Sequence, residues 1–296
     1  MKFNYLILFF ALGVLISSCS NTEIKSDAYG NFEATEVIVS AQANGELLKF
    51  EIQEGDVLEE GRVIGLIDTT DLHLKKKLLD QQKLTIGSQL VSINSEIEVQ
   101  RQQLENNKVN QTRIQKMYNQ GAATKKQLDD INGLVDLNTK MITAIISKKQ
   151  NILDQINGVE IQKEQIGEAI SKCLIQSPQN GTVMVKYSEA GELAIMGKPL
   201  FKLADIKNIK LKAYISGAQL PHVKLGDEVE VLYDKNDKEN SVTQGKVVWI
   251  SSTAEFTPKT IQTKEERVNL VYAIKVLVSN NGNIKIGMPG EMNFNK

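Results

Sequence analysis

A repeat interrupted by a long insertion constrains this chain more than any other feature of its sequence. Residues 39–68 align with residues 175–204 without a gap, and three turn positions coincide: Asn44-Gly45 with Asn180-Gly181, Gly55 with Gly191, and Gly61 with Gly197. Short apolar alternations between the glycines are typical of β-strands bounded by turns. Glycine supplies the positive φ that such turns require. We therefore predict two copies of one β-strand motif, split by inserted residues.

Paired half-motifs of this kind resemble the biotinyl/lipoyl carrier fold, in which two four-stranded halves complete one flattened barrel. In a carrier, the halves meet at a tight hairpin whose tip bears the modified lysine. Here residues 71–173 separate the halves, so no acceptor lysine can lie at that tip, and we expect no cofactor. The nearby run Lys75-Lys76-Lys77 is interpreted as the solvated start of a helix.

The insertion has a seven-residue apolar period, which is typical of a coiled coil. In its first arm, one seam position holds Leu72, Leu79, Ile86, Ile93 and Ile114, and the other holds Leu90, Ile97, Leu104 and Tyr118. In its second arm, one seam position holds Leu128, Val135, Ile142, Ile156 and Ile170, and the other holds Ile131, Ile145, Ile152, Val159 and Ile166. The polar exceptions are Gln100, Asn107, Gln111 and Asn138.

The two arms, residues 72–119 and 124–171, match in length and can fold back as an antiparallel hairpin. At about 1.5 Å per residue the hairpin projects roughly 70 Å. No proline precedes Pro178, so nothing in the insertion forces a break. Asn132-Gly133 and Asn157-Gly158 are turn-type pairs, but the seven-residue register runs through both, and we expect them to be helical.

The segment between the arms carries the strongest functional signal. Gly121 permits a turn, and Thr124 with Gln127 forms a capping box for the second arm. Because the seam uses Ile114 and Tyr118, Met117 must point elsewhere. An apolar side chain without a seam partner at the end of a stalk predicts a contact surface.

The N-terminus has the pattern of a secretory signal. A positive start at Lys2 precedes an apolar run over residues 5–16, which is too short to span about 30 Å of hydrocarbon. The run ends in Ser17-Ser18-Cys19, which resembles a bacterial lipobox. We expect residues 1–18 to be removed and Cys19 to carry lipid that holds the protein on a membrane. The alternative is an ordinary signal with a cysteine there by chance.

Composition excludes several classes of protein. The 35 Lys and Arg residues nearly balance the 36 Asp and Glu residues, so no nucleic-acid partner is indicated. With two cysteines and two histidines, a disulfide scaffold is excluded and a metal site is not expected. After Ala204, alternating strands around residues 209–213, 229–231, 247–249 and 270–278 predict a β-barrel-like module without a catalytic constellation. No enzyme activity is expected.

Together, the split β motif, the long hairpin and the lipid anchor resemble the periplasmic adaptor, or membrane fusion, proteins of the HlyD-like family. Hairpins of that family carry Arg, then Leu four residues later, then Ser seven residues further, and these residues meet a TolC-like outer-membrane channel. This chain has Arg113, Met117 and Thr124 at that spacing, with Met for Leu and Thr for Ser. The stretch 254–280 resembles the barrel of adaptors that accompany ABC-type exporters, and residues 284–294 resemble its last strand.

The expected fold is an elongated α+β chain in which a split lipoyl-like β domain holds an antiparallel helical hairpin and precedes a β-barrel domain. The expected boundaries are 1–18 for the signal, 19–29 for the tether, 30–70 plus 174–206 for the split domain, 71–173 for the hairpin and 207–296 for the barrel. The resemblance implies a periplasm-facing lipoprotein of the inner membrane. It would link an exporter, with the ABC type favoured, to the channel, and would self-associate into a ring, taken as a hexamer. The alternative function is a lipid-anchored coiled-coil scaffold with no transport role.

Overall fold

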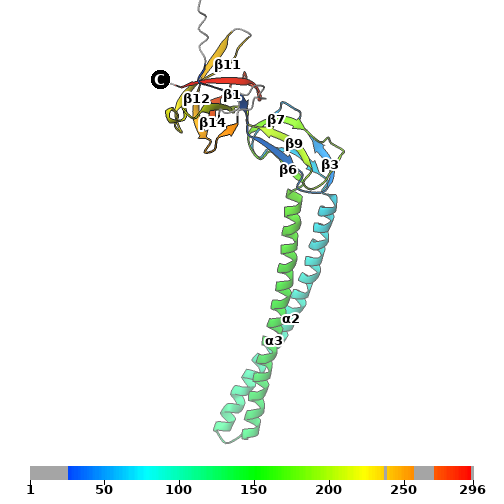
Figure 1. The fold of residues 1–296 in the computed structure, drawn as a ribbon. Helices are drawn as coiled ribbons and strands as arrows, with labels where there is room; N and C mark the ends of the chain where they lie inside the picture. Colours follow the sequence, from blue (N-terminus) through cyan, green and yellow to red (C-terminus); the bar gives the residue numbers. More distant parts are fainter. Residues whose placement is uncertain (1–25, 237–238, 257–269, 295–296) are drawn as a thin grey trace, which may run out of the picture. The chain divides into compact units, whose positions relative to one another are not determined.

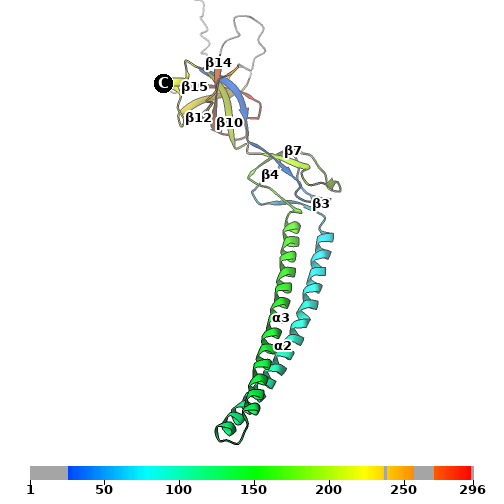
Figure 2. The ribbon, with the colours of Figure 1, turned by 60° about the horizontal axis from the view of Figure 1, so that its bottom comes forward.

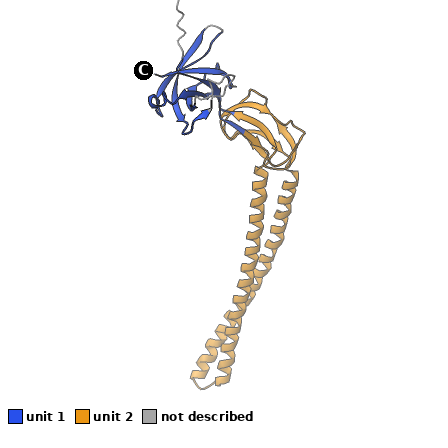
Figure 3. Cartoon of the chain, in the orientation of Figure 1, with its two compact units in different colours: residues 1–37, 204–296 blue, residues 38–203 orange. Residues whose placement is uncertain are grey.

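The computed structural model describes residues 26–236, 239–256 and 270–294, and the chain divides into two compact units (Figure 3). One unit is residues 38–203, which contain the split β domain and the hairpin. The other joins the N-terminal residues up to Val37 to the segment that starts at Ala204. Each unit has its own hydrophobic core.

The split β domain is built from two four-stranded sheets, and each sheet takes strands from both copies of the repeat. One sheet has the order β2 (Glu36–Ser40), β9 (Pro199–Ala204), β7 (Gly181–Lys186), β4 (Val57–Leu58). The other has the order β6 (Leu174–Gln176), β5 (Val63–Ile67), β3 (Gly45–Phe50), β8 (Leu193–Ala194). Their shared core contains fully buried side chains from both copies, among them Leu47, Ile67, Phe201 and Leu203. Neither copy can bury its apolar face without the other.

Hydrogen bonds repeat between the two copies, which confirms the internal repeat. The Asn44 Oδ1 atom accepts the Met196 amide at 2.7 Å, and the equivalent Asn180 Oδ1 atom accepts the Glu60 amide at 2.9 Å. The Gly55 amide donates to the Val183 carbonyl as the Gly191 amide does to the Leu47 carbonyl, both at 2.8 Å. Gly55 and Gly191 have φ values of 96° and 89°, a region that favours glycine.

The insertion forms two continuous helices, α2 (Thr70–Asn119) and α3 (Lys125–Ser171), which lie side by side in Figures 1 and 2. Thr69 is the N-cap of α2, and the Asp68 carboxylate accepts the amide and hydroxyl of Thr70 at 2.9 and 2.6 Å. Both Gly133 and Gly158 are helical. The predicted antiparallel hairpin is confirmed.

The seam between the helices has an apolar block in its middle, and polar layers interrupt its apolar residues on either side, where Ile131 and Val159 are also buried. Apolar seam residues pack together in the middle block: Ile86, Leu90, Ile93, Ile97, Ile145, Ile152 and Ile156. No helix among the described residues is both long enough and apolar enough to cross a membrane.

The second unit contains a closed six-stranded barrel. Its strands follow the order β10 (Asn208–Ser216), β1 (Ala28–Glu33), β15 (Pro289–Phe294), β11 (Glu228–Asp234), β12 (Asn240–Ile250), β14 (Leu270–Ser279), and β14 pairs again with β10. The short strand β13 (Glu255–Phe256) extends the sheet at β14, and a 3-10 helix, η2 (Leu220–His222), lies between β10 and β11. The predicted β-barrel module is confirmed.

One expected boundary was wrong. The sequence ended the tether at residue 29 and began the split domain at residue 30, but β1 (Ala28–Glu33) crosses this boundary and is a strand of the barrel, between β10 and β15. Ala28 and Phe32 are each 1% exposed in the barrel core. Gly30 lies so close to the Lys212 carbonyl that an added Cβ would overlap it. Burial of alternate side chains therefore draws the N-terminal strand into the barrel.

Candidate docking site at the hairpin tip

The tip is a tight, hydrogen-bonded turn between Asn119 and Lys125. The carbonyl of Met117 accepts the amides of Gln120 and Ala122 at 3.2 and 2.8 Å. Gly121 has a φ of 73°, which a residue with a side chain rarely adopts. These bonds satisfy carbonyls that the end of α2 would otherwise leave open, so the backbone of the tip is fixed.

Thr124 begins α3 with a complete capping box. Its Oγ1 atom accepts the Gln127 amide at 3.3 Å, and the Gln127 Oε1 atom accepts the Thr124 amide at 2.8 Å. The Thr124 hydroxyl also lies 3.1 Å from that Oε1 atom. The predicted cap is confirmed, and it occupies the Thr124 side chain within the free chain.

Arg113 and Met117 lie four residues apart on α2 and so share one face of the helix. Both are exposed, with Met117 at 40%, and an Arg113 Nη2 atom donates to the Asn110 Oδ1 atom at 2.8 Å. The structure thus presents Arg113, Met117 and Thr124 to solvent at the end of the hairpin. Their role in docking stays a prediction.

Tyr118 departs from its expected place in the seam, because it is 37% exposed. The register of the hairpin puts it level with the first turn of α3, where Lys125 and Lys126 offer no apolar partner. The tip therefore exposes two neighbouring large side chains, Met117 and Tyr118, where the sequence predicted one.

The tip also carries a net positive charge, which the residue spacing did not reveal. Residues 106–128 contain no Asp or Glu, and their cationic side chains are Lys108, Arg113, Lys116, Lys125 and Lys126; the carboxylates of Asp129 and Asp130 follow directly and offset part of this charge. A run of residues that lacks carboxylates is a signal that sequence analysis can find. The positive electrostatic field of the tip would attract a partner surface lined by carboxylates or backbone carbonyls.

An amide layer lies in the seam next to the tip. The Asn107 Nδ2 atom donates to the Asn138 Oδ1 atom at 2.8 Å, and the Asn138 Nδ2 atom donates to the Gln100 Oε1 atom at 3.3 Å. Gln111 donates to Asn132 at 2.8 Å. Asn107 and Asn138 are each 7% exposed. Because a buried amide in a coiled-coil seam selects one register, this layer determines which residues meet at the tip.

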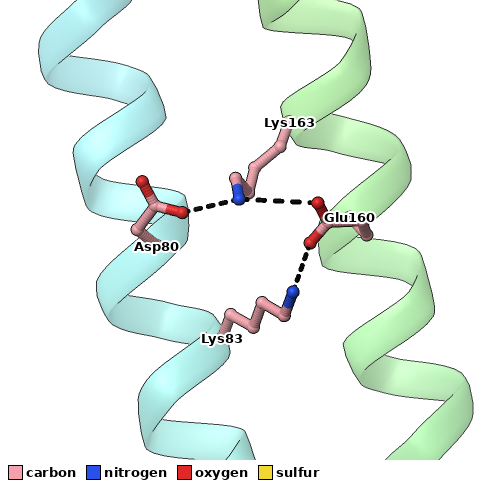
Figure 4. Close-up of polar contacts among 4 residues, drawn as sticks. All are labelled: Asp80, Lys83, Glu160 and Lys163. Atoms are coloured by element: carbon pink, nitrogen blue, oxygen red, sulfur yellow. Dashed lines mark hydrogen bonds and ion pairs between the residues drawn. The ribbon is translucent and has the colours of Figure 1, made fainter.

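A charged layer performs the same task nearer the β domain (Figure 4). The Lys163 Nζ atom lies 2.7 Å from the Asp80 carboxylate and 3.5 Å from Glu160, and the Lys83 Nζ atom lies 2.7 Å from Glu160. The hydrogen bond from Lys163 holds the pKa of Asp80 below its usual value, and that from Lys83 does the same for Glu160. The bond to Asp80 raises the pKa of Lys163. Asp80, Glu160 and Lys163 are therefore charged at neutral pH.

The two cysteines have different outcomes. Cys19, the predicted lipidation site, lies outside the described residues. Cys173 is 1% exposed in the core of the split domain, and its thiol lies 3.3 Å from the Ala169 carbonyl. Burial, together with the charge of Asp68, raises the pKa of the Cys173 thiol. Within the described ranges, no group of three His, Cys, Asp or Glu side chains is placed to hold a metal ion.

Comparison with known proteins identifies the fold. No family model matches the chain. The membrane fusion protein Spr0693 from Streptococcus pneumoniae R6 superimposes with a TM-score of 0.61 at 14% identity, over 90% of this chain and 97% of its own. This chain has the fold of a membrane fusion protein.

Two further comparisons agree with this identification. MacA from Actinobacillus actinomycetemcomitans superimposes with a TM-score of 0.64 at 20% identity, over 90% of this chain and 76% of its own. A UPF0194 membrane protein from Acidithiobacillus ferridurans is 25% identical over 291 residues, which are 88% of this chain and 84% of the relative. The resemblance to membrane fusion proteins that the sequence predicted is confirmed for the fold.

Proposed function

We propose that this protein is a non-enzymatic adaptor in the cell envelope, which links an inner-membrane exporter to a TolC-like outer-membrane channel. Cys19 carries the lipid anchor, and the protein faces the periplasm from the inner membrane. The ABC class of exporter is favoured by the likeness of the barrel segment 254–280 to adaptors of that class. The membrane fusion fold supports the adaptor role.

The observation that carries the proposal is the exposed, basic and fixed tip of a continuous hairpin. About 1.5 Å per residue over α2 gives a reach of roughly 75 Å. At its end, Met117 and Tyr118 offer apolar contact area, surrounded by cations that carboxylates or carbonyls of a channel rim would pair with. Arg113, Met117 and Thr124 are the channel-contact residues of this proposal.

Self-association into a ring, taken as a hexamer, is part of the proposal. The outer face of α2, away from the seam, carries apolar side chains that are each 60–70% exposed: Leu74, Leu78, Leu84, Val91, Val99 and Val109. The helix α3 exposes Leu134, Leu137, Met141, Ile146, Leu153 and Ile161. The α2 residues cluster on one face of that helix, whereas those of α3 are spread around its exposed surface, with Ile146 and Leu153 on one flank of the seam and Leu134 and Met141 on the other. Exposed apolar side chains in such number on a hairpin call for a covering surface.

Some of these α2 residues have an exposed apolar residue of α3 at the same level. The bonds between Gln111 and Asn132 and between Lys83 and Glu160 set the register, so two residues whose numbers total about 243 lie level across the hairpin. By this rule Val109 is level with Leu134, and Val91 with Leu153. In the proposed ring, parallel hairpins lie side by side, and the α2 face with Val91 meets the α3 flank with Ile146 and Leu153 of the next copy, a head-to-tail contact that closes into a ring.

The docking claim is tested by reversing one charge at the tip. A tagged chain is cross-linked in whole cells and purified, and mass spectrometry records an inner-membrane transporter and an outer-membrane channel. We expect Arg113→Asp to retain the transporter and lose the channel. Lys148→Asp, the same reversal at an exposed site in the middle of α3, retains both. Recovery of the channel with Arg113→Asp would contradict the claim, and recovery of neither partner with the unaltered chain would favour the scaffold.

The anchor and the ring have separate tests. Cys19→Ser is expected to move the protein from the membrane to the soluble fraction. For the ring, Val91→Cys combined with Leu153→Cys should give a disulfide ladder beyond the dimer in membranes. Val91→Cys combined with Ile146→Cys, which is on the same face of α3 as Leu153 but about 10 Å away along the helix, should not. Equal ladders from the two pairs would contradict the level-matched contact.

A further inference from the structure

The outer wall of the barrel carries a groove that the adaptor role does not use. Its volume is about 470 Å³, within the range of small-molecule sites. Three neighbouring strands line it: β10 with Lys210 and Lys212, β12 with Val248 and Trp249, and β14 with Lys275 and Leu277. Figure 1 labels two of these strands, β12 and β14.

The floor of the groove is apolar because of a bulge in β12. The pairing of β12 with β14 shifts between Val247 and Trp249. The regular alternation of buried and exposed residues therefore breaks, and Val248 and Trp249 both face outward, each 40% exposed. Trp249 is the only tryptophan of the chain. Bulges re-aim side chains in this way next to binding sites.

Two lysines in the wall of the groove lie close enough for their positive charges to repel each other. Lys212 and Lys275 are direct cross-strand partners, an arrangement that destabilises a sheet. Each has a carboxylate at the margin, Glu255 at 3.5 Å from Lys212 and Glu33 at 2.6 Å from Lys275. The Lys275 ammonium also lies 5.5 Å from the centroid of the Trp249 ring.

Lys210 supplies a further positive charge. Its Nζ atom donates to the Thr35 hydroxyl at 3.1 Å, and its cross-strand partner on β1, Glu33, directs its carboxylate to Lys275 instead. Three lysines less the two carboxylates, Glu33 and Glu255, leave one net positive charge over the apolar floor. A ligand that matches this groove has an apolar body and a head with one negative charge.

We propose that the groove binds a dissolved anionic amphiphile, with its apolar body over Trp249, Val248 and Leu277 and its carboxylate or phosphate head against the lysines. A charge-assisted hydrogen bond from Lys210 holds the head, since this ammonium is the one not balanced by a carboxylate. The finite volume of the groove favours a single chain in solution over a membrane surface. This site does not depend on the adaptor function and is tested without a partner protein.

Trp249 provides the readout, because its fluorescence is the only tryptophan signal of the protein. The full chain carrying Cys19→Ser, so that no attached lipid competes, is titrated with sodium dodecanoate below its critical micelle concentration. Parallel titrations use dodecyltrimethylammonium chloride and dodecyl maltoside. We expect saturable binding of dodecanoate, and binding of the other two at least about fivefold weaker, the ratio that one exposed charge contact supports.

Lysine variants locate the site. Lys210→Gln should weaken dodecanoate binding by about fivefold, and Lys210→Glu should reverse the preference toward the cationic amphiphile. Lys246→Gln, an exposed lysine of β12 outside the groove, should change neither. A reversal of preference distinguishes contact with the head from a general effect on the fold.

Three results would overturn the proposal. Equal affinity for all three amphiphiles would show adsorption on an apolar surface. Dodecanoate binding that is unaltered in Lys210→Gln and Lys210→Glu would place the ligand elsewhere. Lysine-dependent binding to phosphatidylglycerol vesicles without binding of free dodecanoate would show that the groove contacts a membrane surface.

Discussion

The amide layer of the hairpin allows a quantitative test of what determines its register. Asn107 and Asn138 face each other in the seam with a 2.8 Å hydrogen bond, and each is 7% exposed. Replacing one by leucine leaves a polar atom of the other amide buried without its partner across the seam, although Asn138 keeps its bond to Gln100 and Asn107 its long bond from Gln103. Replacing both removes the polar pair and leaves two leucines to pack together.

The magnitudes follow from burial and hydrogen bonding. An unpaired buried amide costs about 2 kcal/mol, and the buried apolar surface of one leucine returns about 1 kcal/mol in a half-covered seam. Each single variant, Asn107→Leu or Asn138→Leu, should therefore lose about 1 kcal/mol of unfolding free energy. The double variant has no unpaired amide at these two sites and should gain about 1 kcal/mol, because half-buried Gln100 can bind water again.

Urea unfolding followed by circular dichroism at 222 nm measures these values, since α2 and α3 supply almost all the helix of the described residues. Asn151→Leu, at an exposed site on α3, is the control and should change stability by less than about 0.5 kcal/mol. If the effects of the two single substitutions simply added, the double variant would lose about 2 kcal/mol of unfolding free energy. We expect it to gain about 1 kcal/mol instead, so the coupling energy between the two sites is about 3 kcal/mol. An additive double variant would refute the account of the layer.

Three shorter predictions concern other described sites. Because folding lowers the pKa values of Asp80 and Glu160, these carboxylates stabilise the fold at pH values above their usual pKa values of 3.8 and 4.5, and that stability is lost as the pH falls through the lower pKa values of the folded state. Thermal melts from pH 7 to pH 3 should therefore show a smaller loss of stability in Glu160→Gln than in wild type. Gly133→Ala should stabilise α3 by about 1 kcal/mol because nothing within 4 Å opposes a Cβ, whereas Gly121→Ala, at a φ of 73°, should destabilise the tip in the same urea assay. The Cys173 thiol, buried and with a raised pKa, should resist maleimide at pH 8 in the native protein and react fully in urea, as mass spectrometry would record; rapid native labelling would contradict the buried position.

Periodic features of this fold could be predicted from the sequence because their causes are local. The seven-residue spacing predicted both arms of the hairpin, and Thr124 with Gln127 predicted the cap, since a capping box involves residues three apart. The aligned glycines predicted the split domain for the same reason. Their turns depend on backbone conformation at single residues, such as Gly55 and Gly191.

Features that depend on distant partners were missed. Asn107 and Asn138 stood out only as polar exceptions, because the antiparallel register alone brings them together. Strand β1 was assigned to the wrong module, since its partners β10 and β15 lie far along the chain.

Among the candidate site residues, spacing found Arg113 and Met117. The exposure of Tyr118 follows instead from what α3 places opposite it. The groove around Trp249 depends on a strand-pairing irregularity that has no sequence signature.

The nested order of the modules has a consequence for how the chain folds. Strand β1 pairs with β10 and β15, β5 pairs with β6 across the whole insertion, and α2 meets α3 across a short turn, so each module encloses the next. Closing a flexible loop of about 100 residues costs about 4 kcal/mol in entropy. A hairpin that forms first removes most of that cost, because its base already holds residues 70 and 171 side by side. Folding should therefore proceed from the inside outward, and the barrel, which needs both ends of the chain, should be the last part to form.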